Sequence, residues 1–382
     1  MAQRTRHLPE IDVVRTTGFA AVVGLHTLGS VGTGELGTGL GLQLLHFGRE
    51  TFFILTAFVL TRSAATRPPA PGAGLLRFWR RRFALVGLPY TVWTVLYWLT
   101  RLEGRDPWSA DALRGLRHSL VMGTGMYHLY FLQVALQAYL LFPLLLLLVL
   151  RTRRHHAALL GVAGAVQATY LAVLRWVPAP GGWAQNLWLS PNQLVLTYVF
   201  PLLVGAVAAC HHEAVLAWVG RHRAAVPAVV GAALALDLGT FAAQVLAGAD
   251  PVRASEPLQP VSVVWGPAAA LGLLALGARL RRGPTPVTAP VTAMVTALAR
   301  EGARVSFGVY LVHPLVLSVL LGASGWAHGG SAWPLPVVFV LTWVGTLLGS
   351  VALVQLLSRL PLAVALTGRP RVRPAPPTPV PT

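Results

Sequence analysis

The sequence predicts an all-α integral membrane protein, a bundle of about ten transmembrane helices. The 382 residues are 55% hydrophobic and only 11% charged, whereas a soluble domain is typically about 25% charged. The mean hydropathy is +0.63. The apolar residues form runs of about 20, the length that crosses a bilayer as a helix. We expect one membrane domain at 12–360, a cytoplasmic segment at 1–11 and a disordered, Pro/Arg-rich cytoplasmic tail at 361–382.

Ten apolar segments of spanning length can be drawn along the chain. The first is interpreted as a span rather than a cleaved signal peptide, because Arg15 interrupts its start. Little chain remains between the segments, so no large soluble domain is expected. The predicted spans are 12–30, 43–61, 84–100, 127–150, 157–175, 192–210, 224–247, 259–279, 305–323 and 336–358.

The charges indicate how the chain is oriented in the membrane. All 30 basic residues are arginine, against 12 acidic residues, and they lie in short clusters between the apolar runs. Ten spans place 23 of these arginines on the side of the termini, which predicts cytoplasmic termini by the positive-inside rule. This pattern reflects topology, so no nucleic-acid partner is expected. Arginine in place of lysine, together with the Ala, Gly and Pro content, suggests the coding bias of a GC-rich bacterium. The expected location is the plasma (inner) membrane. The single cysteine, Cys210, excludes an internal disulfide.

Ionisable residues within spans are costly and usually face the bundle interior. Arg15 and His26 are eleven positions apart, so both project from one face of the first helix, about 16 Å apart along its axis. Two interpretations stay open. The pair forms part of a functional site, or Arg15 reaches the lipid headgroups and His26 bonds to a neighbouring helix.

A second polar stripe lies in the ninth segment. Ser306, Tyr310 and His313 recur at helical spacing and share a face. Pro314 cannot donate a backbone hydrogen bond, so it should free a carbonyl near that face. The alternative to a functional stripe is a structural network of hydrogen bonds between helices.

Other polar residues have less certain roles. Glu50 follows Arg49 in the second segment, and the two form either a functional pair or a neutralised ion pair. Asp237 is a lone acid in the seventh segment with no evident partner. The run Arg80, Arg81 and Arg82 before the third segment is either a stop-transfer signal that also contacts anionic lipid, or a phosphate-binding cluster.

Taken in order, these segments resemble the acyltransferase 3 family, bacterial membrane proteins that acylate surface glycans. Arg15-x10-His26 looks like that family's basic-x10-His signature, and Glu50-Thr-Phe-Phe-Ile-Leu-Thr-Ala-Phe like its Asp-x-Phe-Phe stretch. Departures are visible: Glu50 replaces Asp, Thr56-Ala57 replaces Ser-Gly, and Leu85 stands where a second basic residue would follow Arg82. The remaining similarities are Arg80–Arg82 followed by Pro89-Tyr90, Tyr127-His-Leu-Tyr-Phe-Leu, and Ser306-x3-Tyr310-Leu-x-His313.

The resemblance implies transfer of an acyl group, commonly acetyl, from cytoplasmic acyl-CoA to a hydroxyl of a surface or lipid-linked glycan. His26 would be the general base, because an imidazole can accept the hydroxyl proton near neutral pH. Arg15, Tyr310 and His313 would stabilise the oxyanion or guide the thioester, and Glu50 would complete the catalytic set.

On the donor side, Arg80, Arg81 and Arg82 would bind acyl-CoA. No metal is expected, and the expected partners are the glycan acceptor and membrane lipids. Two alternatives stay open: a transporter or flippase for a glycan or acylated lipid, and a scaffold without catalysis.

Overall fold

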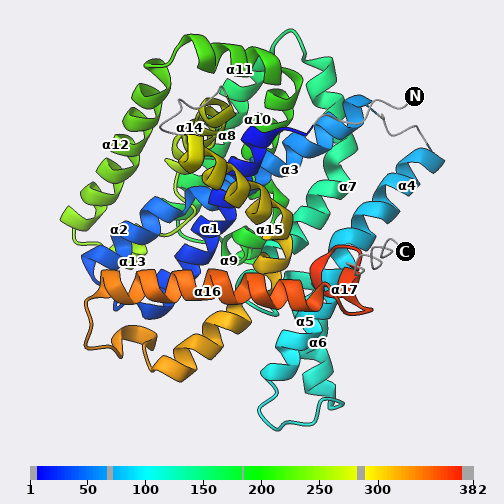
Figure 1. Cartoon of the computed structure of the whole chain (residues 1–382), viewed down its shortest axis with the longest axis vertical. Helices are drawn as coiled ribbons and strands as arrows, with labels where there is room; N and C mark the ends of the chain where they lie inside the picture. The colour runs from blue at the N-terminus through cyan, green and yellow to red at the C-terminus, as the bar shows by residue number, and fades with distance from the viewer. Residues whose placement is uncertain (1–6, 67–71, 183–184, 282–288, 372–382) are drawn as a thin grey trace, which may run out of the picture.

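The computed structural model describes residues 7–66, 72–182, 185–281 and 289–371, and these residues form helices without any strand (Figure 1). The long helices are connected by short loops and by short helical turns. The α-helices are α1 (Pro9–Val31), α2 (Leu36–Leu45), α3 (Phe47–Thr66), α4 (Ala73–Arg82), α5 (Leu88–Thr100), α6 (Ala110–Met122), α7 (Tyr130–Arg151), α8 (His156–Trp176), α9 (Gln185–Leu189), α10 (Val199–Cys210), α11 (His212–Arg221), α12 (Ala225–Leu246), α13 (Pro251–Ala254), α14 (Ser262–Arg281), α15 (Ala289–Ser324), α16 (Leu335–Leu357) and α17 (Ala363–Thr367).

The prediction of an all-α membrane protein is confirmed. Within the described residues, eight helices are long and apolar enough to cross a membrane, or nine if the bent pair Val195–Cys210 and His212–Arg221 is one span. Each of these coincides with one of the ten predicted segments. The remaining segment is α1, which has 23 residues but carries Glu10, Asp12 and Arg15. A helix of 23 residues is about 34 Å long, so α1 is long enough to span.

Helix α1 is the central helix of the bundle. It packs against α2, α3, α14, α15 and α16, which surround it in Figure 1. Such a helix can carry polar residues because its neighbours, rather than lipid, cover them. The arrangement therefore places the Arg15 and His26 face of α1 inside the protein.

Small residues allow some helices to approach closely. Helix α10 packs along α3, and a methyl group on Gly205 would overlap the backbone carbonyl of Ile54. Close approach at glycine is the usual basis of tight helix packing in membranes, where hydrophobic burial provides little driving force. This contact fixes α3, which carries Arg49, Glu50 and Phe52, against the rest of the bundle.

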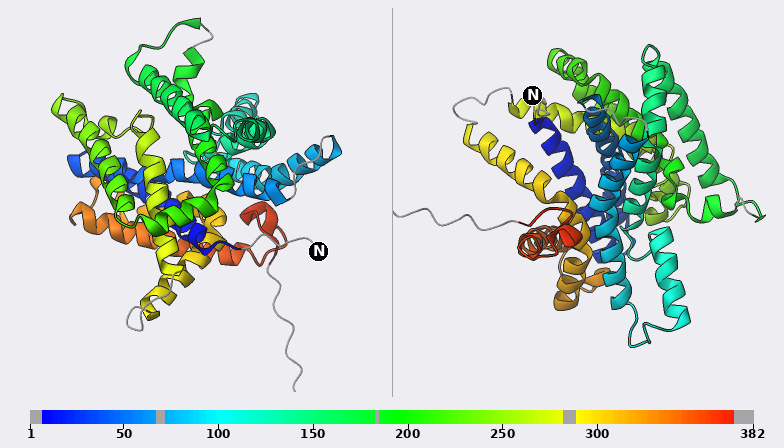
Figure 2. Two further views of the ribbon diagram at one scale, coloured as in Figure 1. Left: turned by 90° about the horizontal axis from the view of Figure 1, so that it is seen from above. Right: turned by 90° about the vertical axis from the view of Figure 1, so that its right-hand side faces the viewer.

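Helices α5 and α6 form a pair that projects from the bundle, seen at the bottom of Figure 1 and of the right view in Figure 2. Helix α5 continues α4 through a π-helical turn at Phe83–Gly87. The N-terminus of α6 is capped by the Ser109 hydroxyl, which accepts a hydrogen bond from the Ala112 N–H at 3.2 Å. The Tyr90 hydroxyl donates to the Leu120 carbonyl at 2.7 Å and joins the pair.

The end of the chain differs from its prediction. We predicted a disordered tail from residue 361, but residues 361–371 are described and include helix α17. Ala363 and Thr367 on α17 are buried, which explains why local composition did not reveal this helix. The rest of the predicted tail, 372–382, and residues 1–6 of the predicted N-terminal segment lie outside the described residues.

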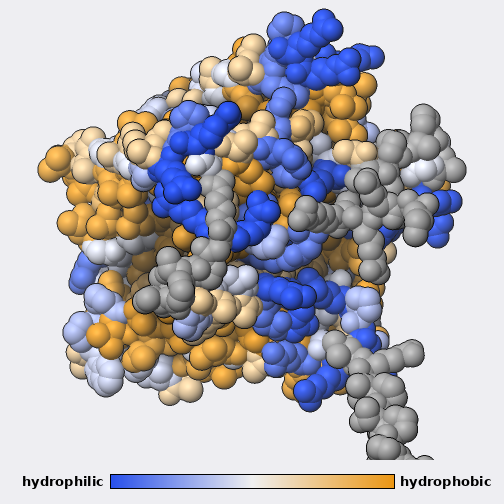
Figure 3. Space-filling model, turned by 45° about the horizontal axis from the view of Figure 1, so that its top comes forward, coloured by the Kyte–Doolittle hydropathy of each residue, from blue (hydrophilic) through white to orange (hydrophobic). Residues whose placement is uncertain are grey.

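The surface has the character expected of a membrane protein. Figure 3 shows broad areas of hydrophobic residues, with hydrophilic residues gathered in separate clusters. Many large apolar side chains are exposed on the long helices, among them Leu144 on α7, Val162 on α8 and Leu348 on α16. Such faces are stable in contact with lipid, whereas their exposure to water would be costly in free energy.

Candidate functional site

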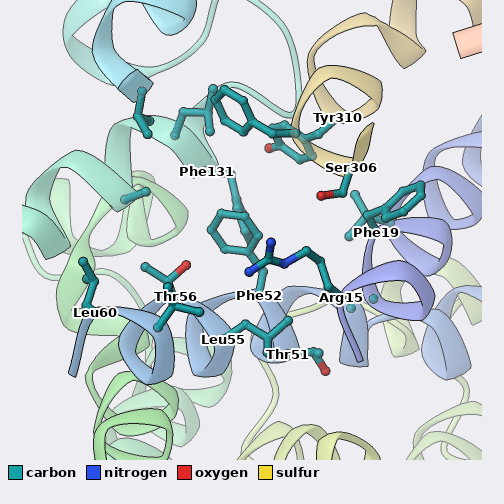
Figure 4. Close-up of a pocket in the computed structure, with 18 of the residues that line it drawn as sticks. Arg15, Phe19, Thr51, Phe52, Leu55, Thr56, Leu60, Phe131, Ser306 and Tyr310 are labelled. Carbon is teal, nitrogen blue, oxygen red and sulfur yellow. The ribbon is translucent and has the colours of Figure 1, made fainter. Parts of the chain in front are cut away.

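A cavity of about 330 Å³ lies between α1, α3, α7 and α15 (Figure 4). Its walls combine apolar and polar side chains. In Figure 4, Arg15 extends from α1 toward Phe52 and Leu55 of α3, while Ser306 and Tyr310 of α15 lie opposite. The polar stripes that the sequence predicted on α1 and α15 therefore face the same space.

Three arginines line one end of this cavity: Arg15, Arg82 and Arg369. We call them the basic mouth. Arg15 and Arg82 both interact electrostatically with Tyr139, and Arg369 interacts with Arg15. The Arg82 guanidinium lies 5.9 Å from the centroid of the Tyr139 ring. Among the described residues these three arginines form no ion pair, so the mouth is suited to an anionic ligand.

The arginine run predicted to bind the donor is divided by the fold. Only Arg82 lines the cavity, whereas Arg80 and Arg81 are exposed on α4. Helical geometry explains the division, because successive residues point in directions 100° apart. Arg82 is the member of the run that the structure brings together with Arg15.

His26 lies further along α1 than Arg15. The rings of His128 and His313 lie beside it, and we call these three residues the histidine cluster. The ring centroids of His26 and His313 are 5.4 Å apart with the rings stacked, and those of His128 and His313 are 5.0 Å apart. Tyr127 packs on His26 at 4.4 Å. The cluster joins α1 to α15 and to the chain just before α7.

Pro314 determines how His313 is held. A helical residue at 314 would donate its N–H to the Tyr310 carbonyl, but proline has no N–H. The freed carbonyl accepts a hydrogen bond from His313 Nδ1 at 2.8 Å. A carbonyl only accepts, so Nδ1 carries the proton. Nε2 of a neutral His313 is then an acceptor, and it has no partner among the described residues.

A second cavity of about 60 Å³ adjoins the histidine cluster. His26, His128 and Arg49 line it, whereas His313, which is fully buried, does not. Among the described residues, Val22, Phe131 and Tyr310 line both cavities, so the second cavity lies next to the first. A reactant in the second cavity would therefore meet His26 and His128, with His313 stacked behind them.

The donors near the histidine cluster differ in whether they already have a hydrogen-bond acceptor within the protein. The Tyr310 hydroxyl donates to the backbone carbonyl of His128. Neither ring nitrogen of His128 completes a hydrogen bond among the described residues, although the Leu311 carbonyl interacts with the ring. A neutral imidazole carries one N–H, so His128 can present this donor to a ligand in the second cavity. The sequence prediction named Tyr310 and His313 as donors, but in the structure both have their protons directed to backbone carbonyls.

Glu50 lies outside both cavities. Its carboxylate accepts hydrogen bonds from Arg49 Nε at 3.0 Å and Nη2 at 2.5 Å, and both side chains are 7% exposed. Arg49 also donates to the Pro257 carbonyl at 2.5 Å. Glu50 thus orients Arg49, which lines the second cavity. The structure does not bring Glu50 into contact with the histidine cluster.

Other polar residues within the helices have structural partners. Asp237, for which the sequence suggested none, accepts a hydrogen bond from Gln43 at 2.8 Å. Gln137 bonds to the Gln193 carbonyl at 2.7 Å and the Val195 N–H at 3.0 Å. In the described part of the chain, no group of three or more metal-binding side chains could hold a metal ion.

The structure adds two residues to the cavities, His128 and Arg369. His128 stands at the start of the 127–150 segment, a position that predicts the acceptor side for it, and its ring lines the second cavity. The prediction missed Arg369, because its proline-rich surroundings are typical of a disordered tail. Arg369 could not be recognised without the tertiary contacts that bring it to the first cavity.

Comparison with known proteins identifies the family. Residues 8–355 match the acyltransferase domain of the acyltransferase 3 family. The comparison with curated proteins found no match, and neither did the comparison with solved structures. The matched region contains Arg15, the histidine cluster and the helices that form the walls of the two cavities. The chain therefore belongs to the acyltransferase 3 family and is a multi-pass membrane O-acyltransferase.

Proposed function

We propose that the protein transfers an acetyl group from acetyl-CoA to a hydroxyl of a cell-surface or lipid-linked glycan. One observation carries the proposal: a single cavity is lined by the basic mouth at one end and adjoins the histidine cluster at the other. The mouth suits the phosphates of the donor. The cluster suits proton transfer from a hydroxyl.

The geometry supports approach of donor and acceptor from opposite sides. Arg15 and His26 are eleven residues apart on α1, which is about 16 Å along the helix. The flexible thiol arm of acetyl-CoA would extend along the first cavity and pass Val22, Phe131 and Tyr310 to bring the thioester to His26 at the second cavity. The excess of arginine on the side of the termini favours the cytoplasm as the donor side. The acceptor would then enter the histidine cluster from outside, at the plasma membrane of a bacterium.

The roles of His26 and His128 in the transfer reaction differ, because one imidazole accepts a proton and the other donates a hydrogen bond. His26 faces the second cavity and takes the proton from the acceptor hydroxyl as its oxygen attacks the thioester carbonyl. The N–H of His128 donates to the oxyanion of the tetrahedral intermediate. Collapse of the intermediate breaks the carbon–sulfur bond, forms the ester, and returns the proton from His26 to the CoA thiolate.

Two other residues support this reaction without touching the reacting atoms. His313 stacks on His26 at a centroid distance of 5.4 Å and is held by the Tyr310 carbonyl, so it positions the base. Glu50 holds Arg49 at the wall of the second cavity. Arg49 has an Nη1 with no partner among the described residues, and this N–H is available to an acceptor oxygen.

The test uses purified protein in sealed vesicles of known orientation. Acetyl-CoA labelled in its acetyl group is supplied on the side of the termini, with chitooligosaccharides as the acceptor probe on one side at a time. We expect free CoA thiol to appear on the donor side, and labelled sugar to form with acceptor on the opposite side. His26→Ala is the inactive control.

Three results would count against the proposal. Labelled sugar formed only when donor and acceptor share one side would exclude transfer across the membrane. Wild-type protein that releases no CoA thiol would exclude acetyl-CoA as the donor. Movement of unmodified oligosaccharide across the vesicle membrane without thiol release would indicate a transporter instead.

A further inference from the structure

The chain continues past α16 and returns to the cavity. We call Ser358–Arg371 the C-terminal strap; it contains α17 and lies beyond the residues that match the family. Figure 1 shows α17 at the end of α16, close to α5. The strap packs against α5, α15 and α16.

Specific contacts anchor the strap. Trp93 Nε1 on α5 donates a hydrogen bond to the Leu366 carbonyl at 3.0 Å. Gly368 ends α17 with a φ of +67°, a conformation that favours glycine. A methyl group at this position would also overlap the ring of Phe307, which itself lines the first cavity. Gly368 therefore allows the strap to lie directly against the cavity wall.

The strap delivers Arg369 to the cavity. Arg369 lines the first cavity and also a third cavity of about 200 Å³, which Arg304, Ser358 and Thr367 line with it. Partial burial, together with the like charges of Arg15 and Arg304, lowers the pKa of Arg369. Arg304 is hydrogen-bonded to Glu301 at 2.7 Å. Arg369 also interacts with Glu301, but it forms no ion pair within 4.0 Å among the described residues.

The strap also lies close to the segment that follows Arg82. The Leu85 carbonyl is 3.3 Å from the position that a methyl group on Gly368 would occupy. Arg369 follows Gly368 directly, and like Arg82 it lines the first cavity.

We infer that Arg369 binds a phosphate group of the acyl donor, and that the C-terminal strap is part of the donor site. The inference rests on the proposed function for the identity of the donor. Like charges held together at a cavity, without acidic partners, are stabilised when an anion binds between them. A guanidinium binds phosphate through charge-assisted hydrogen bonds, so its loss should weaken binding about tenfold.

The test measures equilibrium binding of CoA to the full chain in nanodiscs of neutral phosphatidylcholine. Wild type is compared with Arg369→Ala and with Arg359→Ala, an exposed arginine of the same strap as a matched control. We expect Arg369→Ala to raise the Kd for CoA about tenfold, Arg359→Ala to leave it within twofold, and Arg369→Lys to give an intermediate value. Pantetheine, which lacks phosphate, should bind equally to all variants, and 3′-dephospho-CoA shows which phosphate is involved.

A second arm separates the donor from an anionic lipid headgroup, because phosphatidylcholine carries no net charge. If Arg369 binds a lipid headgroup, the defect of Arg369→Ala in CoA binding will be absent in neutral nanodiscs and will appear only with anionic lipid. That result, or an unchanged Kd for CoA, would overturn the inference. Gly368→Ala retains every arginine but displaces the strap, and it should reduce CoA binding as Arg369→Ala does.

The outcomes distinguish this inference from the proposed function. Wild type that binds CoA and transfers acetyl groups, with Arg369→Ala unchanged in both, would refute the role of the strap alone. Wild type that binds no CoA would refute the proposed donor, and the inference with it.

Discussion

Replacing Glu50 by glutamine should destabilise the protein by about 3 kcal/mol. The substitution keeps the size of the side chain and one acceptor oxygen, but it removes the charge that compensates Arg49. Arg49 is only 7% exposed, and its other hydrogen bond goes to the Pro257 carbonyl. Breaking a buried ion pair by removing one partner typically costs about 3–5 kcal/mol. The retained acceptor puts the expected value at the lower end.

The measurement is the free energy of unfolding of detergent-purified protein. The control is Asp111→Asn, which removes the acid of the Arg114–Asp111 pair, because the two side chains are 71% and 87% exposed. An exposed pair contributes about 0–1 kcal/mol, so this variant should unfold almost as wild type does. A double variant, Arg49→Met with Glu50→Met, buries no charge and should recover most of the stability lost in Glu50→Gln.

Two results would refute this reasoning. Glu50→Gln could unfold at wild-type free energy while losing acetyl transfer, which would show that the carboxylate acts in the reaction. The double variant could be less stable than Glu50→Gln, which would show that Glu50 does more than neutralise Arg49.

Three further predictions follow from the site and the packing. His26→Ala should lower the transfer rate about 10²–10⁴-fold through loss of the base, with unchanged membrane abundance on immunoblots; activity near wild type would remove His26 from the mechanism. His128→Phe should lower kcat about 10²–10³-fold with little change in KM, and steady-state kinetics in which KM alone rises would exclude an oxyanion role. Gly205→Ala should destabilise the protein by about 1–3 kcal/mol because the methyl group overlaps the Ile54 carbonyl, whereas Gly231→Ala, with nothing within 4 Å, should leave the thermal midpoint unchanged or higher.

Local sequence patterns predicted the elements well because each span satisfies its own backbone hydrogen bonds. The polar stripe of α15 is an example: Ser306 and Tyr310 line the first cavity, and His313 stacks on His26. The carbonyl that Pro314 was expected to free is that of Tyr310, and His313 uses it. These features depend only on the periodicity of a helix and the chemistry of proline.

The orientation of neighbouring residues required the structure. Arg49 and Glu50 are adjacent, and both are buried, so the sequence did not indicate which of them faces a cavity. In the fold, a methyl group on Gly266 of α14 would overlap the Glu50 side chain, so Glu50 packs toward α14, while Arg49 lines the second cavity. The choice depends on which helix packs against each face, and that information is not local.

Helix α17 at the end of the chain could not be predicted from local sequence either. The proline-rich composition after residue 360 is typical of disorder, but the Trp93 hydrogen bond and burial of Ala363 and Thr367 hold α17 in place. Short helices of this kind have little stability of their own and form through tertiary contacts.

Val22, Phe131 and Tyr310, which line both cavities, also bear on the permeability of the membrane. Over most of its area a bilayer resists ions with about 30 Å of hydrocarbon. In this protein two neighbouring cavities take the place of part of that thickness. An ion that crossed from one cavity to the other would dissipate part of the membrane potential, which is worth about 2.3 kcal/mol per charge at 100 mV. Bulky side chains beside both cavities oppose such a leak, independently of any part that they take in recognising substrates.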